Sequence, residues 1–82
     1  MSARLTLVTR AFCPLCDEMH NALQNLHLVR PFELAIADVD AGAQLLRQWD
    51  WRVPVLLAQN GEPVCEGHFD EAAVIKHLGR IG

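Results

Sequence analysis

Thr9-Arg10-Ala11-Phe12-Cys13-Pro14-Leu15-Cys16 is the stretch that decides how this chain folds. The apolar run before it, residues 5–9, predicts a strand, and from Leu15 onward apolar residues recur at helical spacing. The stretch therefore joins a strand to a helix. Cys13 falls at the N-cap position and Pro14 at the first helical position, where the N–H that proline lacks would have no partner anyway.

The spacing of the two cysteines predicts a redox centre. Cys16 follows Cys13 by three residues, about one helical turn, so the two sulfurs can approach each other above the end of the helix. The unpaired N–H groups and the positive end of the helix dipole favour a thiolate at Cys13. A thiolate attacks disulfides, and a second thiol beside it resolves the mixed disulfide that forms. We therefore assign Cys13 as the nucleophile and Cys16 as the resolving thiol.

Composition limits the class of protein. The 82 residues are expected to form a single domain over 1–82, and 51% hydrophobic with 21% charged residues is typical of a soluble globular chain. A net charge of −3 without a basic cluster argues against nucleic acid and against an anionic membrane surface as partners. No apolar run has transmembrane or signal-peptide length. Three cysteines, two of them in a C-x-x-C, do not make a secreted disulfide scaffold and fit a reducing cytoplasm better. We also expect a monomer.

The rest of the pattern predicts the order βαβαββα. Strands are expected at 4–9, 32–39, 55–58 and 63–66, with the first covered on both faces. A helix is expected from Pro14 to about His27, a second from Asp40, as its N-cap, to Trp49, and a third after an N-cap at Asp70. Asn60-Gly61 is the expected hairpin turn between the last two strands. The first helix should bury one apolar face and carry a more polar face beside it. The apolar face consists of Leu15, Met19, Ala22, Leu23 and Leu26. The polar face consists of Cys13, Cys16, His20 and His27.

Several short segments together resemble one known family. The Cys13–Cys16 motif follows a first strand, Asp38-Val39-Asp40 ends a second, Arg52-Val53-Pro54-Val55 opens a third, and Gly67 follows a fourth. This arrangement resembles the glutaredoxins of the thioredoxin superfamily, and most closely the compact bacterial glutaredoxin-like proteins, over essentially the whole chain. The resemblance implies a thioredoxin-like α/β fold with a four-stranded mixed sheet and three helices. It also implies a dithiol–disulfide oxidoreductase that reduces protein or glutathione mixed disulfides.

The resemblance assigns further roles. It implies a cis bond before Pro54, with the Val53 backbone beside the cysteines as a platform for a disulfide substrate in an extended conformation. It implies glutathione contacts at Arg10 and Gly67, although Arg10 also fits a solvated arginine at the end of a strand. No tightly bound cofactor is expected, and glutathione is a candidate reductant. Leu15 replaces a tyrosine of the family and His68 a glycine, so protein disulfides and a reductase of the thioredoxin-reductase type remain alternatives.

A metal or iron–sulfur carrier is the alternative from a different class. Cys13, Cys16 and His20 form C-x2-C-x3-H, and Cys65 is a candidate fourth ligand of zinc. The ligands would lie on one helix without a second knuckle, so we predict no metal site. Cys65 is more simply a small buried residue. Trp49 continues an apolar helix face, whereas Trp51 is a candidate for the wall of a substrate groove near Pro54.

Overall fold

A four-stranded mixed sheet forms the centre of the protein in the computed structural model, which describes residues 3–81. The strands are β1 (Arg4–Thr9), β2 (Glu33–Asp38), β3 (Val55–Leu57) and β4 (Pro63–Glu66), in the order β2-β1-β3-β4. Strand β2 is parallel to β1, and the other pairs are antiparallel. Three α-helices complete this part of the chain: α1 (Pro14–Val29), α2 (Ala43–Trp49) and α3 (Glu71–Ile81). The fold predicted from the sequence is confirmed.

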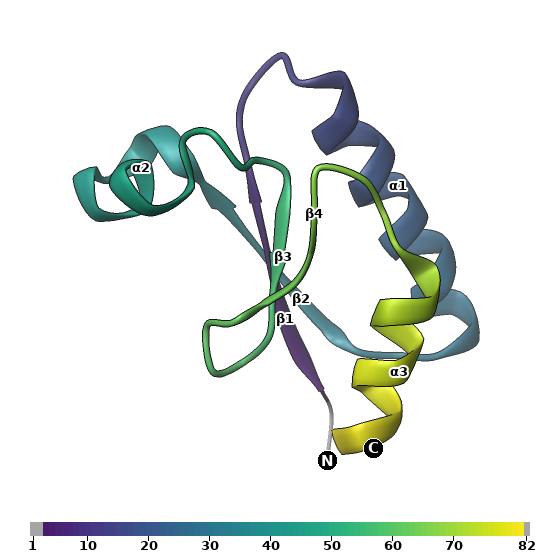
Figure 1. Ribbon diagram of the computed structural model, residues 1–82. Coiled ribbons are helices and arrows are strands. Elements are labelled where there is room, and N and C mark those ends of the chain that lie inside the picture. The colour runs from purple at the N-terminus through teal and green to yellow at the C-terminus, as the bar shows by residue number, and fades with distance from the viewer. Residues whose placement is uncertain (1–2, 82) are drawn as a thin grey trace.

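Helices cover both faces of the sheet. Helices α1 and α3 lie on one face, and the short helix α2 lies on the other (Figure 1). Two groups of buried side chains fill the space between these layers. The group under α1 and α3 consists of Leu5, Leu7, Met19, Leu23, Leu26, Phe32, Leu56, Val74 and Leu78. The group under α2 consists of Val8, Val39, Trp49, Val55 and Leu57, which confirms the core position of Trp49.

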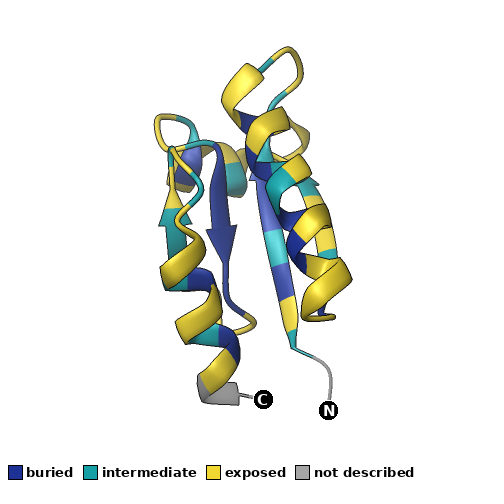
Figure 2. Ribbon diagram, turned by 90° about the vertical axis from the view of Figure 1, so that its right-hand side faces the viewer, coloured by how far each residue is buried: buried dark blue, intermediate teal, exposed yellow. Residues whose placement is uncertain are grey.

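Strand β1 lies inside the sheet, as its continuous apolar sequence predicts. Leu5, Leu7 and Val8 have no exposed surface. In Figure 2 the neighbouring inner strand β3 is dark blue along its length, and β1 combines buried with intermediate and exposed positions. In the strand register, Val8 lies opposite Ala37 of β2 and Val55 of β3. The turn after β1, the start of β3 and the end of β4 therefore share one end of the sheet, and the redox motif lies at that end.

The first helix differs in detail from the expected pattern. It extends to Val29, two residues beyond the expected end. The sequence pattern predicts Cys16 on the polar face, but Cys16 is only 2% exposed and belongs to the core. It predicts Leu15 on the apolar face, but Leu15 is 40% exposed. The shift follows from the geometry at Cys13: because the helix begins there, Cys16 points into the core together with Met19 and Leu23.

The segment after β2 corrects one capping assignment. Strand β2 ends at Asp38, and a 3-10 helix, η1 (Val39–Ala41), separates it from α2. The Asp38 carboxylate accepts a hydrogen bond of 2.9 Å from the Asp40 N–H and caps η1. Gly42 is the N-cap of α2 and has no side chain to contribute. The prediction that Asp40 caps the second helix is therefore wrong, because the Asp40 carboxylate binds a guanidinium instead.

The C-terminal part follows the prediction closely. Strand β3 ends at Leu57 rather than at residue 58, and a register shift occurs between Leu56 and Leu57 opposite β4. Gly61 in the hairpin has a φ of +88°, a conformation that glycine adopts readily. The Asp70 carboxylate accepts a hydrogen bond of 3.0 Å from the Ala73 N–H and so acts as the N-cap of α3. None of the helices in the described residues is long and apolar enough to cross a membrane.

Candidate active site

The turn between β1 and α1 presents the two cysteines. Phe12, directly before them, has a φ of +58° and a completely exposed ring. The chain then becomes extended at Cys13, and the helix begins at Pro14. The Cys13 sulfur accepts a hydrogen bond of 3.2 Å from the Cys16 N–H, so a sulfur takes the place of the usual capping oxygen. The predicted N-cap position of Cys13 is thus confirmed.

The two sulfurs are joined in a disulfide, and their environments differ. The Cα atoms lie 5.2 Å apart, within the range of protein disulfides. Cys13 is partly exposed at the end of the helix, whereas Cys16 lies beneath it with 2% of its surface exposed. Cys13 is therefore accessible from solvent, and Cys16 is not. After reduction, the amide hydrogen bond and the helix dipole act on the sulfur that solvent and substrate can reach.

Val53 and Pro54 lie at the same end of the sheet. The peptide bond between them is cis, as the family resemblance implies. Pro54 is buried, and its carbonyl accepts a hydrogen bond of 2.7 Å from the Gly67 N–H at the end of β4. Gly67 has a φ of +78°, a backbone conformation that favours glycine. A Cβ atom there would meet no atom within 4 Å, so the backbone angle and not a lack of space accounts for the glycine. His68, exposed, follows in the bend.

The backbone of Val53 has no hydrogen-bond partner within residues 3–81, at either its N–H or its C=O. Its side chain is half-buried and packs against the core beneath α2. Two backbone groups that can pair with another chain thus lie at the end of the sheet that carries Cys13.

Arg10, three residues before Cys13, is held by two carboxylates. Its Nε and Nη2 atoms donate to the two Asp40 oxygens at 3.0 and 3.1 Å. Nη2 also donates to the Asp50 carboxylate, and Nη1 to the Asp50 carbonyl oxygen at 3.4 Å. The hydrogen bonds to Asp40 raise the pKa of Arg10 most, and the hydrogen bond to Asp50 raises it further. The hydrogen bonds from Arg10 in turn lower the pKa of Asp40. Neither contact with Arg10 was predicted from the sequence, since Asp40 and Asp50 lie 30 and 40 residues away.

A second arginine braces the segment before Val53. Arg52 donates two hydrogen bonds, of 2.7 and 2.6 Å, to the two carboxylate oxygens of Glu66 in β4. Its guanidinium also lies 4.5 Å from the centre of the Trp49 ring. The hydrogen bonds to Arg52 lower the pKa of Glu66. The loop that carries Val53 is therefore fixed to β4 on one side and to α2 on the other.

Large apolar side chains are exposed in the segments that surround the disulfide. The exposed fractions are 103% for Phe12, 40% for Leu15 and 94% for Trp51. Phe12 and Leu15 flank Cys13 in the sequence, and Trp51 lies two residues before Val53. Trp51 was expected to line a groove, but its almost complete exposure makes it a projecting side chain. Phe12 was not singled out, although an aromatic residue directly before Cys13 was a usable signal.

The side chains considered for zinc do not form a ligand set. Within the described residues, no group of three or more His, Cys, Asp or Glu side chains is placed to hold a metal ion. Cys65 is half-buried on β4, where it packs against the core beneath α1 and α3, and burial raises its pKa. Its packing fits the simpler interpretation of a small apolar residue, although it is half-buried rather than buried.

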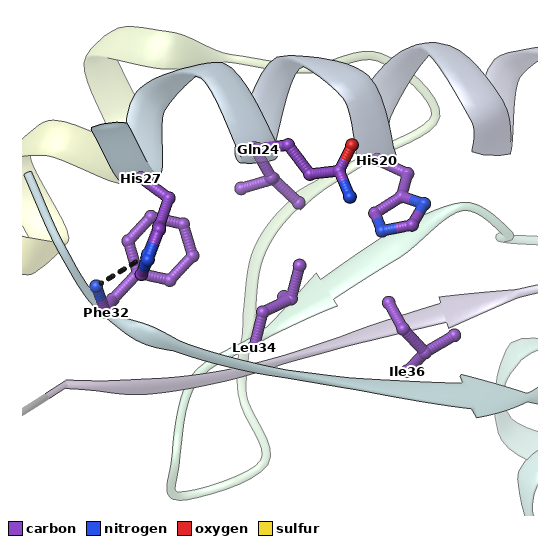
Figure 3. Close-up of a pocket in the computed structure, with 7 residues that line it drawn as sticks. His20, Gln24, His27, Phe32, Leu34 and Ile36 are labelled. Carbon is purple, nitrogen blue, oxygen red and sulfur yellow. Dashed lines mark hydrogen bonds between the residues drawn. The ribbon is translucent and has the colours of Figure 1, made fainter. Parts of the chain in front are cut away.

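His20 belongs to a different feature, a pocket of about 390 Å³ between α1 and β2. His20, Gln24 and His27 project from α1 toward Leu34 and Ile36 of β2 (Figure 3). The Nδ1 atom of His27 accepts a hydrogen bond of 3.2 Å from the Phe32 N–H, and the two rings meet edge to face. The pocket is an apolar hollow with polar groups on its helical side.

The order β2-β1-β3-β4, with a C-x-x-C pair at the first strand–helix turn, defines a protein of the thioredoxin fold. Thioredoxin 1 from Thermosipho africanus TCF52B has this fold with a TM-score of 0.66 at 16% identity, over 95% of this chain and 92% of that chain. The family model described as "Glutaredoxin-like domain (DUF836)" matches residues 4–79. The chain therefore belongs to the glutaredoxin-like family.

Two further solved structures are similar to this chain. Protein Ne2328 from Nitrosomonas europaea, determined by NMR in solution, is 29% identical with a TM-score of 0.86; the match covers 95% of this chain and 93% of that one. Protein XcR50 from X. campestris, determined by X-ray analysis, is 30% identical with a TM-score of 0.70, over 93% of this chain and 96% of that one. No curated protein matches the chain.

Proposed function

We propose that this protein is a dithiol–disulfide oxidoreductase that uses Cys13 as its nucleophile and Cys16 as its resolving thiol. One observation carries the proposal: the Cys13 sulfur caps α1 and is accessible, whereas the Cys16 sulfur is directly beneath it and buried. Such a difference suits two successive roles. The accessible sulfur attacks the substrate, and the buried sulfur reacts only with the mixed disulfide that the first step places beside it.

The proposed reaction transfers two electrons in two exchanges. The Cys13 thiolate attacks one sulfur of the substrate disulfide; a bond forms between these sulfurs, the substrate S–S bond breaks, and the released thiolate takes up a proton. The Cys16 thiol then loses its proton and attacks the Cys13 sulfur. The second substrate thiolate leaves and is protonated in turn. The substrate ends as two thiols, and the protein as the Cys13–Cys16 disulfide seen in the structure.

The Val53 backbone is proposed to orient the substrate. Its N–H and C=O have no partner within the described chain and lie at the end of the sheet that carries Cys13. A substrate segment in an extended conformation would pair with both groups as an added strand. The bracing of Arg52 by Glu66 and Trp49 supports this role, because it holds the preceding residue in place. Gly67 would contribute by keeping β4 bonded to Pro54.

The partners follow from this chemistry. The substrates are disulfides of proteins or glutathione mixed disulfides, and the reductant is glutathione or a reductase of the thioredoxin-reductase type. The exchange needs no bound cofactor, because the electrons pass directly between sulfurs. We place the protein in the reducing cytoplasm as a monomer, where its disulfide would be reduced after each turnover.

Reduction of insulin by dithiothreitol, followed by the turbidity of the released chains, tests the proposal. The wild type and Cys65→Ser are expected to accelerate the reaction, and Cys13→Ser is expected to lose the acceleration. Replacing dithiothreitol by NADPH with glutathione and glutathione reductase, or by NADPH with thioredoxin reductase, identifies the reductant. A Cys13→Ser variant as active as the wild type, or a wild type without activity in any of the three systems, would refute the proposal.

A further inference from the structure

Arg10 has almost no capacity left for an anionic ligand. A guanidinium offers five N–H donors. In the structure Nε makes one hydrogen bond, Nη2 makes two and Nη1 makes one, all to oxygens of Asp40 and Asp50. The family resemblance assigns a glutathione carboxylate to this arginine. In this chain two of its own carboxylates occupy the fork that such a ligand would need.

The two carboxylates also reverse the sign of the charge beside Cys13. One guanidinium between two carboxylates leaves a net negative group at this position. Further ionisable residues occupy the element ends that meet at this end of the sheet. The carboxylates are Asp17, Asp38, Glu66 and Asp70, and the guanidiniums are Arg47 and Arg52, the second of which is paired with Glu66. Carboxylates therefore predominate among the described side chains around the redox centre.

This charge lies close enough to act on a substrate. Three peptide units separate Arg10 from Cys13, so their Cα atoms are at most about 11 Å apart, and the charged cluster lies within one arginine side chain of the Arg10 Cα. The Debye length is roughly 30 Å at 0.01 M salt and about 3 Å at 1 M. A charged group bonded to the Cys13 sulfur is therefore influenced by the Arg10 cluster at low ionic strength and is screened from it at high ionic strength.

We propose that Asp40 and Asp50 determine the substrate specificity of the redox centre by saturating Arg10. They disfavour anionic disulfides such as oxidised glutathione, and favour disulfides flanked by positive charge, as in a protein segment with lysine or arginine beside its cystine. The exposed rings of Phe12 and Trp51 suit such a polypeptide better than a small polar thiol. This inference rests on the proposed exchange at Cys13 and follows the same two steps.

Three symmetric disulfides that differ in charge test the inference. They are cystamine with two ammonium groups, bis(2-hydroxyethyl) disulfide with none, and oxidised glutathione with a net negative charge. Each oxidises the reduced full-length protein under pseudo-first-order conditions. The remaining thiols are measured by acid quenching, alkylation and mass spectrometry. Dividing each rate constant by that of dithiothreitol with the same disulfide removes the intrinsic differences between the leaving groups.

The wild type is expected to prefer cystamine over oxidised glutathione by a factor on the order of ten at 0.01 M salt, from the Coulomb energy of a net unit charge at this distance. The preference is expected to disappear at 1 M salt. Asp40→Asn and Asp50→Asn should each reduce it several-fold at low salt. Glu33→Gln, which removes the same charge from the Arg4 pair at the opposite end of the sheet, should leave it unchanged.

The outcomes separate this inference from the proposed function. If none of the disulfides oxidises the Cys13–Cys16 pair, the proposed function fails. If all three react and their normalised rates are equal, independent of salt or unaltered by both aspartate variants, the function stands and the charge inference is overturned. The salt dependence of the wild type provides this test even if an aspartate variant fails to fold.

Discussion

The backbone of Phe12 stores strain beside the nucleophile, and substitution can release it. A φ of +58° costs an L-residue about 1–2 kcal/mol of conformational free energy, and glycine is free of this cost. The ring is fully exposed, so its removal sacrifices no buried surface. The greater freedom of glycine in the unfolded chain offsets about 0.5–1 kcal/mol of the gain. We therefore expect Phe12→Gly to exceed Phe12→Ala in free energy of unfolding by about 0.5–1 kcal/mol, because alanine keeps the strain.

Thermal unfolding of the two oxidised variants, followed by circular dichroism, measures this difference. For a domain of this size, about 1 kcal/mol corresponds to a Tm difference of roughly 4–8 °C. The comparison is well matched, because both variants lose the same ring and differ only in a Cβ atom. A Phe12→Ala variant that melts at the same temperature as Phe12→Gly, or above it, would refute the reasoning about strain.

Three further predictions concern the core, the third thiol and the Arg10 pair. Leu56 is fully buried, so Leu56→Ala should lower the free energy of unfolding, measured in urea, by about 2–5 kcal/mol. Leu46 is 38% exposed, so Leu46→Ala should lower it far less. Equal losses would contradict the assigned core. Burial raises the pKa of the Cys65 thiol. In the folded, oxidised protein, labelling of Cys65 by a maleimide should therefore require a higher pH than in the denatured chain. Coincident pH profiles of labelling would show that the thiol is not buried. Arg10 lowers the pKa of Asp40, so this pair stabilises the fold above the usual carboxyl range, and its contribution is lost as the pH falls through the lowered pKa. The stability difference between the wild type and Asp40→Asn should accordingly be present near pH 6 and should shrink as the pH falls below the usual carboxyl range; a difference that is constant with pH would exclude this origin.

The fold could be predicted from the sequence where its signals are local. The run before Cys13, the proline after it and the helical spacing beyond Leu15 are contiguous, so they defined β1, the start of α1 and the capping role of Cys13. The same holds for the turn at Gly61 and for the cap at Asp70. Each of these features depends on residues within a few positions of one another.

The site was only partly predictable, because its remaining contacts are long-range. Asp38 and Asp40 carry the same capping signal two residues apart, and the pairing of Asp40 with Arg10 in the folded chain decides between them. The sequence offers no sign that Arg10 meets Asp50, 40 positions away. The positive φ of Phe12 is equally hidden, since aromatic residues rarely adopt it.

Trapping of the reaction intermediate tests the central claim most directly. Cys16→Ser, once reduced, is incubated with a disulfide-bonded peptide, quenched in acid and digested without a reductant, and the adduct is located by mass spectrometry. We predict a mixed disulfide between the peptide and Cys13 that accumulates because no resolving thiol remains, whereas the wild type proceeds to its Cys13–Cys16 disulfide. An adduct on Cys65, or no adduct on Cys13, would contradict the assignment of this pair as the redox centre.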